Sequence, residues 1–203
     1  MKSITVYCGS STKLDRTFHE AAKIVGKDIA QNNLRLIYGG GSIGLMGTLA
    51  ASVKQNGGEV IGIITSKFVK LEQANNECNE LIVTDTIQER RTQMINRGDG
   101  FLMLPGGIGT YEEFFEVLVG RQINDHSKPI GIVNINGYFE PLLTMLEHGI
   151  HNGFIRPALR KLILIDELPS NAVNNMLLHK VNQPTPEEIL PMHQSRQGEN
   201  DSR

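Results

Sequence analysis

The sequence predicts an α/β fold: a single Rossmann-like domain with an open, mostly parallel sheet and helices on both faces. Three observations lead to this prediction. Apolar, β-branched segments alternate with segments whose apolar residues recur at helical spacing. Several strand segments are continuous apolar runs, as expected for strands covered on both faces. Glycine stands at many of the junctions, where tight turns would connect strand and helix.

The order of the elements follows from these patterns. The first strand, residues 3–8, is apolar and β-branched, and the helix expected at residues 14–33 carries Leu14, Phe18 and Val25 on one face. Further strands are expected at residues 34–38, 59–64, 80–85, 100–104, 129–135 and 161–166. Further helices are expected at residues 44–56, 86–97, 110–122, 138–149 and 169–180. This alternation favours parallel neighbours, because each return crosses through a helix.

The chain length and composition suit one domain. Of 203 residues, 39% are hydrophobic and 21% are charged, which allows a substantial core. No linker-like break occurs before about residue 183. We therefore expect a catalytic domain at residues 1–182 and a tail at residues 183–203 that is proline-containing, then polar, and either mobile or an arm that lies on a partner.

Charge and cysteine content exclude several classes of partner. The net charge is −2 and the isoelectric point is about 6.3, so no broad basic surface is expected to recruit nucleic acid or an anionic membrane. Cys8 and Cys78 suggest two reduced thiols rather than a disulfide framework. Neither a long apolar run nor a signal-peptide pattern is seen, so a cytoplasmic protein is expected.

Three strands are expected to end in glycine-rich turns: residues 9–11, 39–42 and 105–110. In open α/β sheets, ligands bind at the carboxyl ends of the strands, where glycine lets the backbone approach an anion. For any one turn, glycine could equally serve a tight connection, but three together favour a phosphate-bearing ligand. The candidate binding residues in these turns are Ser10, Gly40, Gly41, Gly106, Gly107, Gly109 and Thr110.

Two common nucleotide sites are disfavoured. GGGSIG (39–44) fits G-x-G-x-x-G, but it does not follow the first strand. The strand after it also ends in Ile64, Thr65 and Ser66, where a dinucleotide site would place an acid. The chain contains no G-x-x-x-x-G-K-[ST] loop, so a P-loop NTPase is disfavoured too.

Glu113 allows two interpretations from its spacing. Thr110-x-x-Glu113 is a capping box at a helix start, a signature that Thr86 and Glu89 share. Alternatively, Glu113 is a functional carboxylate beside the expected phosphate site, where a cation would have to accompany it. The adjacent Arg90 and Arg91 are candidates for that cation, since they fall at or near the apolar side of their helix.

Together these motifs closely resemble the LONELY GUY (LOG) family of cytokinin riboside 5′-monophosphate phosphoribohydrolases. The motifs that carry the resemblance are YCGSS (7–11), YGGGSIGLMG (38–47), ERR (89–91) and PGGIGTYEE (105–113). The resemblance covers about residues 2–180, and the signature P-G-G-x-G-T-x-x-E is matched at every fixed position.

The resemblance implies roles for individual residues. Arg90 and Glu113 fall on the family's catalytic arginine and glutamate, and Gly106 to Thr110 on its phosphate-binding segment. The family more usually reads E-R-K where this chain has Arg91, which keeps the charge but changes the shape of an expected substrate contact.

The activity implied by the resemblance is hydrolysis of the N-glycosidic bond of an adenine, or N6-substituted adenine, nucleoside 5′-monophosphate. The products would be the free base and ribose 5-phosphate, with no metal and no cofactor. His148 and His151 do not form a convincing set of metal ligands. A non-catalytic nucleotide-binding module is the alternative, since it would keep the glycines but would not need Arg90 and Glu113.

Two further expectations accompany the resemblance. Proteins of this family are often described as lysine decarboxylases, but no lysine lies in a glycine-rich turn where it could hold pyridoxal phosphate, so we do not expect that activity. The helix at residues 110–122 is apolar on more than one side. A neighbouring helix could cover its outer side, but LOG-like proteins are homodimers, which favours a two-fold dimer burying this helix and the helix of Arg90.

Overall fold

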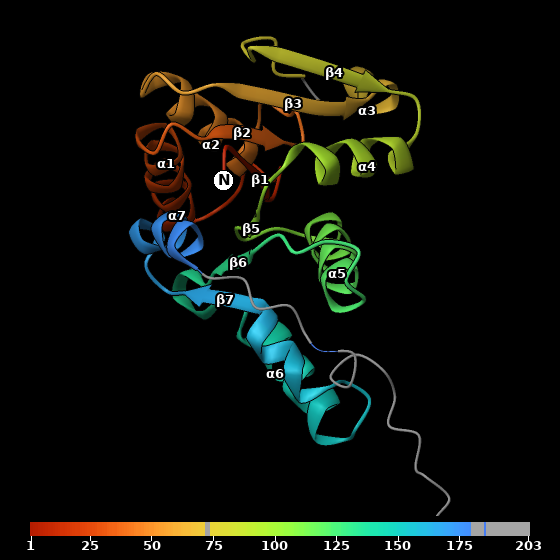
Figure 1. Ribbon diagram of the computed structural model, residues 1–203. Coiled ribbons are helices and arrows are strands. Elements are labelled where there is room, and N and C mark those ends of the chain that lie inside the picture. Colours follow the sequence, from red (N-terminus) through yellow and green to blue (C-terminus); the bar gives the residue numbers. More distant parts are fainter. Residues whose placement is uncertain (72–73, 180–184, 186–203) are drawn as a thin grey trace, which may run out of the picture.

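One parallel sheet with the strand order β4-β3-β2-β1-β5-β6-β7 organises the computed structural model, which describes residues 1–71, 74–179 and 185 (Figure 1). Every strand pair is parallel. The strands are β1 (Ser3–Tyr7), β2 (Arg35–Tyr38), β3 (Val60–Thr65), β4 (Glu80–Thr84), β5 (Phe101–Met103), β6 (Ile130–Val133) and β7 (Ile163–Asp166). The α-helices are α1 (Arg16–Gln31), α2 (Gly44–Gln55), α3 (Ser66–Leu71), α4 (Ile87–Arg97), α5 (Ile108–Gln122), α6 (Glu140–His151) and α7 (Pro169–Leu178), with 3-10 helices η1 (Ile135–Gly137) and η2 (Pro157–Leu162).

The predicted fold class is confirmed, and each expected strand and helix is found near its expected position. The sequence missed α3 and the two 3-10 helices, because elements this short show too little periodicity to be recognised. Helix α5 also begins at Ile108 rather than at residue 110. The expected tail at residues 183–203 lies outside the described residues except for Thr185, so the domain division remains a prediction.

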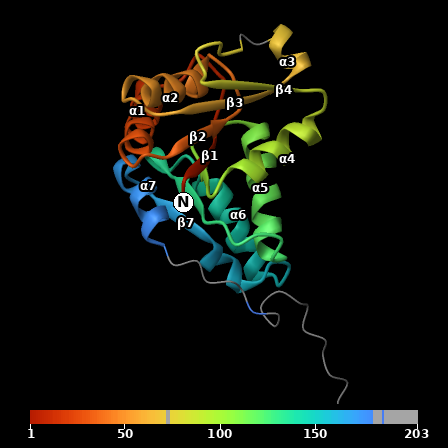
Figure 2. The ribbon, with the colours of Figure 1, turned by 45° about the horizontal axis from the view of Figure 1, so that its top comes forward.

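Helices cover both faces of the sheet. Helices α1, α2 and α7 pack on one face, and α4 and α5 lie on the other (Figures 1 and 2). Each face has its own apolar cluster: Ala22, Leu49 and Val173 belong to the first, and Met94 and Phe114 to the second. Strands β1, β3 and β6 are buried along their whole length between these helices, which explains the continuous apolar runs of the sequence.

Among the described residues, no helix combines the length and the apolar character needed to cross a bilayer.

The order in which strands are added to the sheet reverses between β1 and β5, while all strands stay parallel. From β1 the strands are added outward through β2 and β3 to β4, and the chain then returns so that β5 pairs with β1, Tyr7 opposite Met103. The two connections that follow β1 and β5 meet at this point, where the Gly9 N–H donates to the carbonyl oxygen of Pro105 over 3.0 Å. A crevice at such a switch point is where open α/β sheets bind ligands.

Candidate active site

A cavity of about 320 Å³ opens at the carboxyl ends of β1 and β5. Residues from all three glycine-rich turns, together with polar and apolar side chains from other elements, contribute to its walls. The residues that line it are Val6, Tyr7, Cys8, Gly9, Ser10, Gly39, Met46, Ile64, Phe68, Arg90, Met94, Gly107, Ile108, Gly109, Thr110 and Glu113. Six of the ten residues expected to form the site therefore lie around one cavity.

The amino terminus of α5 faces this cavity. Gly107 is the N-cap residue and has no side chain to accept from the first turn, whose N–H groups have no partner within the helix. These N–H groups and the helix dipole make the terminus suited to an anion. Gly106 is needed for close packing, because a Cβ there would collide with the Thr110 side chain and lie 2.9 Å from the Gly9 nitrogen.

The capping-box interpretation of Thr110 and Glu113 is wrong. Because α5 begins at Ile108, Thr110 lies inside the first turn, and both side chains are buried. The same spacing does produce a cap on α4, where the Thr86 hydroxyl accepts from the Glu89 N–H over 3.1 Å. The same spacing thus forms a capping hydrogen bond on α4 but not on α5. Because α5 begins earlier, the Glu113 carboxylate can pair with another residue.

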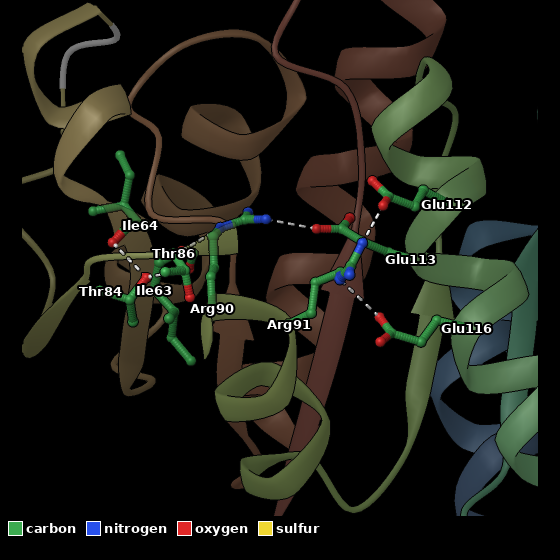
Figure 3. A network of polar contacts seen from close by, with 9 residues as sticks. All are labelled: Ile63, Ile64, Thr84, Thr86, Arg90, Arg91, Glu112, Glu113 and Glu116. Atoms are coloured by element: carbon green, nitrogen blue, oxygen red, sulfur yellow. Dashed lines mark hydrogen bonds and ion pairs between the residues drawn. The ribbon is translucent and has the colours of Figure 1, made fainter. Parts of the chain in front are cut away.

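That partner is Arg90, which reaches Glu113 from α4 across the cavity (Figure 3). The Arg90 Nη1 donates to Glu113 Oε1 over 2.8 Å, and its Nε donates to the Ile63 carbonyl over 2.9 Å. Only 12% of the Arg90 side chain and 11% of the Glu113 side chain are exposed. Gly39 leaves room for the guanidinium, because a Cβ at this position would lie 2.5 Å from Arg90 Nη2.

Burial dominates the electrostatics of Glu113. Desolvation raises the pKa of Glu113 above its ordinary value, and the neighbouring Arg90 guanidinium opposes this rise. Tyr7 lines the same cavity, and burial, followed by the charge of Glu113, raises its pKa well above the usual value. A carboxylate with a raised pKa is a better proton acceptor near neutral pH than an exposed one, which suits general acid–base chemistry.

Arg91 lies outside the set of residues that line the cavity. It forms ion pairs with Glu112 and, through Nε at 3.3 Å, with Glu116, both on α5 (Figure 3). Its charge is thus directed at the neighbouring helix. The substrate contact expected for Arg91 remains a prediction that requires it to leave these glutamates.

Gly40 and Gly41 are also outside the cavity lining. Gly40 has a positive φ of 75°, and its carbonyl accepts from the Asn75 N–H over 2.9 Å. Gly41 forms an isolated antiparallel bridge with Ala74. In this structure the two glycines hold the segment before β4 against the end of β2.

A second cavity, of about 310 Å³, adjoins the first on the other side of the turn formed by Pro105, Gly106 and Gly107, which we call the PGG turn. Gly9, Ser10 and Gly107 line both cavities, and Gly106 lines the second one. Leu14, Phe18 and Tyr138 give the second cavity an apolar wall. The expected phosphate-binding turn thus forms the partition between two spaces.

The sequence missed the apolar wall of the first cavity. Met46, Ile64, Phe68 and Met94 supply it, opposite the polar groups of α5. Phe68 comes from α3, which was not expected at all. Met46 had a signal, since it belongs to the YGGGSIGLMG motif, and Ile64 stood at the predicted end of its strand.

Residues that could hold a metal ion are not gathered at this cavity. Among the residues that the structure describes, no group of three or more histidine, cysteine, aspartate or glutamate side chains is arranged to bind one. The chemistry available at the site therefore consists of a buried ion pair, an anion-binding helix terminus and an apolar wall.

Sequence comparison identifies relatives over most of the chain. Residues 46–176 match the family model described as "Possible lysine decarboxylase". A cytokinin riboside 5′-monophosphate phosphoribohydrolase from Rhodococcoides fascians is 42% identical over 165 residues, covering 81% of this chain and 83% of that protein. The Arabidopsis thaliana phosphoribohydrolase LOG2 is 36% identical over 163 residues, covering 80% of this chain and 76% of that protein.

Comparison with solved structures supports the fold. The molybdenum cofactor binding protein of Rippkaea orientalis superposes with a TM-score of 0.67 at 21% identity, covering 87% of this chain and 96% of that one. The molybdenum cofactor carrier protein of Chlamydomonas reinhardtii superposes with a TM-score of 0.66 at 21% identity, covering 88% of this chain and 100% of that one. At this identity the likeness concerns the fold alone.

Proposed function

Since the chain belongs to the LOG family of phosphoribohydrolases, we propose that it hydrolyses the N-glycosidic bond of adenine, or N6-substituted adenine, nucleoside 5′-monophosphates. The products are the free base and ribose 5-phosphate. The observation that carries the proposal is the buried Arg90–Glu113 ion pair beside the amino terminus of α5.

The 5′-phosphate binds at the amino terminus of α5 in this proposal. Backbone N–H groups of Gly107 and Gly109, with the hydroxyls of Thr110 and Ser10, surround the phosphate. Gly106 allows the turn to pack closely against Gly9. Binding the non-reacting phosphate positions the sugar and so lowers the barrier of the later step.

Glu113 acts on the ribose. As the bond from C1′ to the base breaks, positive charge develops on the sugar, as in glycoside hydrolysis. The Glu113 carboxylate stabilises that charge and orients or deprotonates the attacking water. Arg90 holds the carboxylate in place through its 2.8 Å hydrogen bond, while the Ile63 carbonyl fixes the guanidinium.

The base occupies the apolar end of the cavity. With the phosphate at α5 and C1′ near Glu113, the wall of Met46, Ile64 and Phe68 is the remaining surface for a flat purine. The biological purpose, cytokinin activation or clearance of AMP, depends on whether this end accepts an N6 substituent.

A comparison of three substrates tests the proposal. We expect adenine release from AMP, or base release from isopentenyladenosine monophosphate, to exceed release from adenosine by roughly 10²-fold or more in kcat/KM, because adenosine gives the α5 terminus nothing to bind. Equal turnover of adenosine and AMP would remove the phosphate role. Binding of AMP without release of base would favour a non-catalytic nucleotide-binding module.

Lysine decarboxylation has no support in the site, whatever the description of the family model. It requires a lysine that forms a Schiff base with pyridoxal phosphate. No lysine lines the cavity in the described part of the chain, and Lys128 is engaged with the Ile95 carbonyl at 2.6 Å. Concentrated protein that is yellow and loses its colour with borohydride would overturn this conclusion.

We also propose a homodimer that buries the outer side of α5 together with α4. Phe114, Val117 and Leu118 are buried within the chain, whereas Val119 and Ile123 are each about half exposed at 52% and 51%. These two residues border an apolar hollow of about 520 Å³ between α4 and α5. Light scattering across the assay concentrations tests the dimer, and a fully active monomer at the lowest concentration would exclude it.

A further inference from the structure

Tyr138 contacts the PGG turn from outside the cavity of Arg90 and Glu113. It follows η1, the 3-10 helix after β6, and its hydroxyl donates to the Gly106 carbonyl oxygen over 2.7 Å. The ring packs edge-on against Phe18 and Phe139, with centroid distances of 5.8 and 5.0 Å. Tyr138 is therefore a restrained side chain whose only polar group meets the expected phosphate-binding turn.

The loop that carries Tyr138 has a defined backbone conformation. Asn136 and Gly137 both adopt positive φ, 52° and 68°. The buried Asn134 side chain holds the loop: its amide donates to Glu140 over 2.7 Å, and its oxygen accepts from the Phe139 N–H over 2.8 Å. Such a fixed loop can place one hydroxyl accurately.

The hydrogen bond from Tyr138 determines the orientation of a peptide group. In a trans peptide the C=O and the N–H of the same unit point in opposite directions. Because the Gly106 C=O points at Tyr138, the Gly107 N–H points away from Tyr138. Gly107 lines both the Tyr138 cavity and the cavity of Arg90 and Glu113, so an N–H that points away from Tyr138 is available to a ligand in the latter.

Without a partner for Gly106, this peptide would be free to rotate. Gly106 and Gly107 have no side chains to restrict their backbone, and a Cβ on Gly107 would meet nothing within 4 Å. Rotation of the 106–107 peptide would turn a carbonyl, rather than an N–H, toward a bound anion.

We propose that Tyr138 is a positioning residue for the substrate's 5′-phosphate: its hydroxyl locks the Gly106–Gly107 peptide with the Gly107 N–H facing the phosphate. This inference deepens the proposed function and rests on it.

The test is the Tyr138→Phe variant, which removes the hydroxyl and keeps the ring. We expect the KM for AMP and the Kd for ribose 5-phosphate, measured by titration calorimetry, to rise about 5- to 10-fold, as for the loss of one hydrogen bond to an anion. We expect kcat to change less than about twofold, because Gly109, Thr110 and Ser10 still bind the phosphate and position the sugar, and Glu113 and Arg90 keep their geometry.

Tyr38→Phe is the matched control. It removes a hydroxyl that contacts Asn75 at 2.9 Å and Cys78 at 3.4 Å, away from the phosphate turn. We expect it to leave the KM for AMP and the Kd for ribose 5-phosphate unchanged. A similar rise in both variants would reduce Tyr138 to general support of the fold and overturn the proposal.

Two further results separate this proposal from the function. An unchanged Kd for ribose 5-phosphate in a folded Tyr138→Phe protein overturns the positioning role, even if AMP is hydrolysed. If the wild-type protein releases no base, the proposed function fails, and the ribose 5-phosphate titration still decides the role of Tyr138. Failure of the wild type to bind ribose 5-phosphate overturns both.

Discussion

Arg90 and Arg91 are neighbours on α4, yet they occupy different environments. Arg90 extends into the cavity, where it is bound to Glu113 and to the Ile63 carbonyl. Arg91 turns toward the surface of α5 and pairs with Glu112 and Glu116, whose side chains are 54% and 39% exposed. Both arginines bridge α4 to α5, but only in the Arg90–Glu113 pair are both side chains largely buried.

The difference shows how a step of one residue along a helix, a rotation of about 100°, can separate a proposed chemical role from a structural one. A buried ion pair is costly to desolvate and is weak evidence for stability, so a pair that lines a cavity is a candidate for a functional role. An exposed pair is screened by water and contributes about 0–1 kcal/mol. Exchanging single groups in each pair should therefore affect activity very differently.

Glu113→Gln should have the largest effect. It keeps the volume and one acceptor for Arg90 but removes the negative charge that the reaction requires. We expect kcat/KM for AMP to fall roughly 10²-fold or more, with a stability loss of about 1–2 kcal/mol. Glu116→Gln, the same exchange in the exposed pair, is the control, and near-normal turnover of folded Glu113→Gln would return Glu113 to a purely structural role.

Arg90→Lys should have the next largest effect. Lysine keeps the charge but cannot donate to Glu113 and to the Ile63 carbonyl through one rigid fork. We expect kcat/KM to fall roughly tenfold or more, since the carboxylate loses its fixed orientation. Steady-state kinetics with AMP measures this, and an unchanged value would mean that Glu113 is held by something else.

Acidic pH should reduce activity through Glu113. Burial raises its pKa, so the carboxylate takes up its proton at a higher pH than an ordinary glutamate with a pKa of about 4.3. We expect kcat/KM to decline about tenfold per pH unit once the pH falls below that raised pKa. A profile that stays flat down to about pH 4.3 would contradict the assignment of Glu113 as the ionised group.

Arg91→Lys should have the smallest effect. Lysine can still pair with Glu112 or Glu116 on the surface, and the pair contributes little in water. We expect kcat/KM to change by less than about threefold. A loss as large as that of Arg90→Lys would show that Arg91 leaves its glutamates to contact substrate, and the two arginines would then act together.

Much of the fold followed from local patterns in the sequence. Continuous apolar runs predicted strands covered on both faces, and glycine marked where the strands end. The grouping of residues 9–11 with 105–110 at one edge also followed, because the carboxyl ends of parallel strands lie together. These features depend on residues close in sequence or on a rule that all such sheets obey.

The interaction partners of individual side chains could not be predicted from the sequence. Thr86-x-x-Glu89 and Thr110-x-x-Glu113 have the same spacing, but only the first forms a cap, because α5 begins at Ile108. The sequence also missed Phe68, which comes from the short helix α3, and Tyr138, which lies between η1 and α6 and meets the Gly106 carbonyl only in the folded chain.

By itself, the sequence therefore determined the α/β fold, the family, and the edge of the sheet where the glycine turns gather, since periodicity and motif spacing are local properties of the chain. Only the tertiary structure decided that Arg90 faces Glu113 while Arg91 faces Glu112, and that Tyr138 meets Gly106. The physical reason is that these contacts join elements far apart in the chain, and the packing of each helix on the sheet sets which side of it points inward.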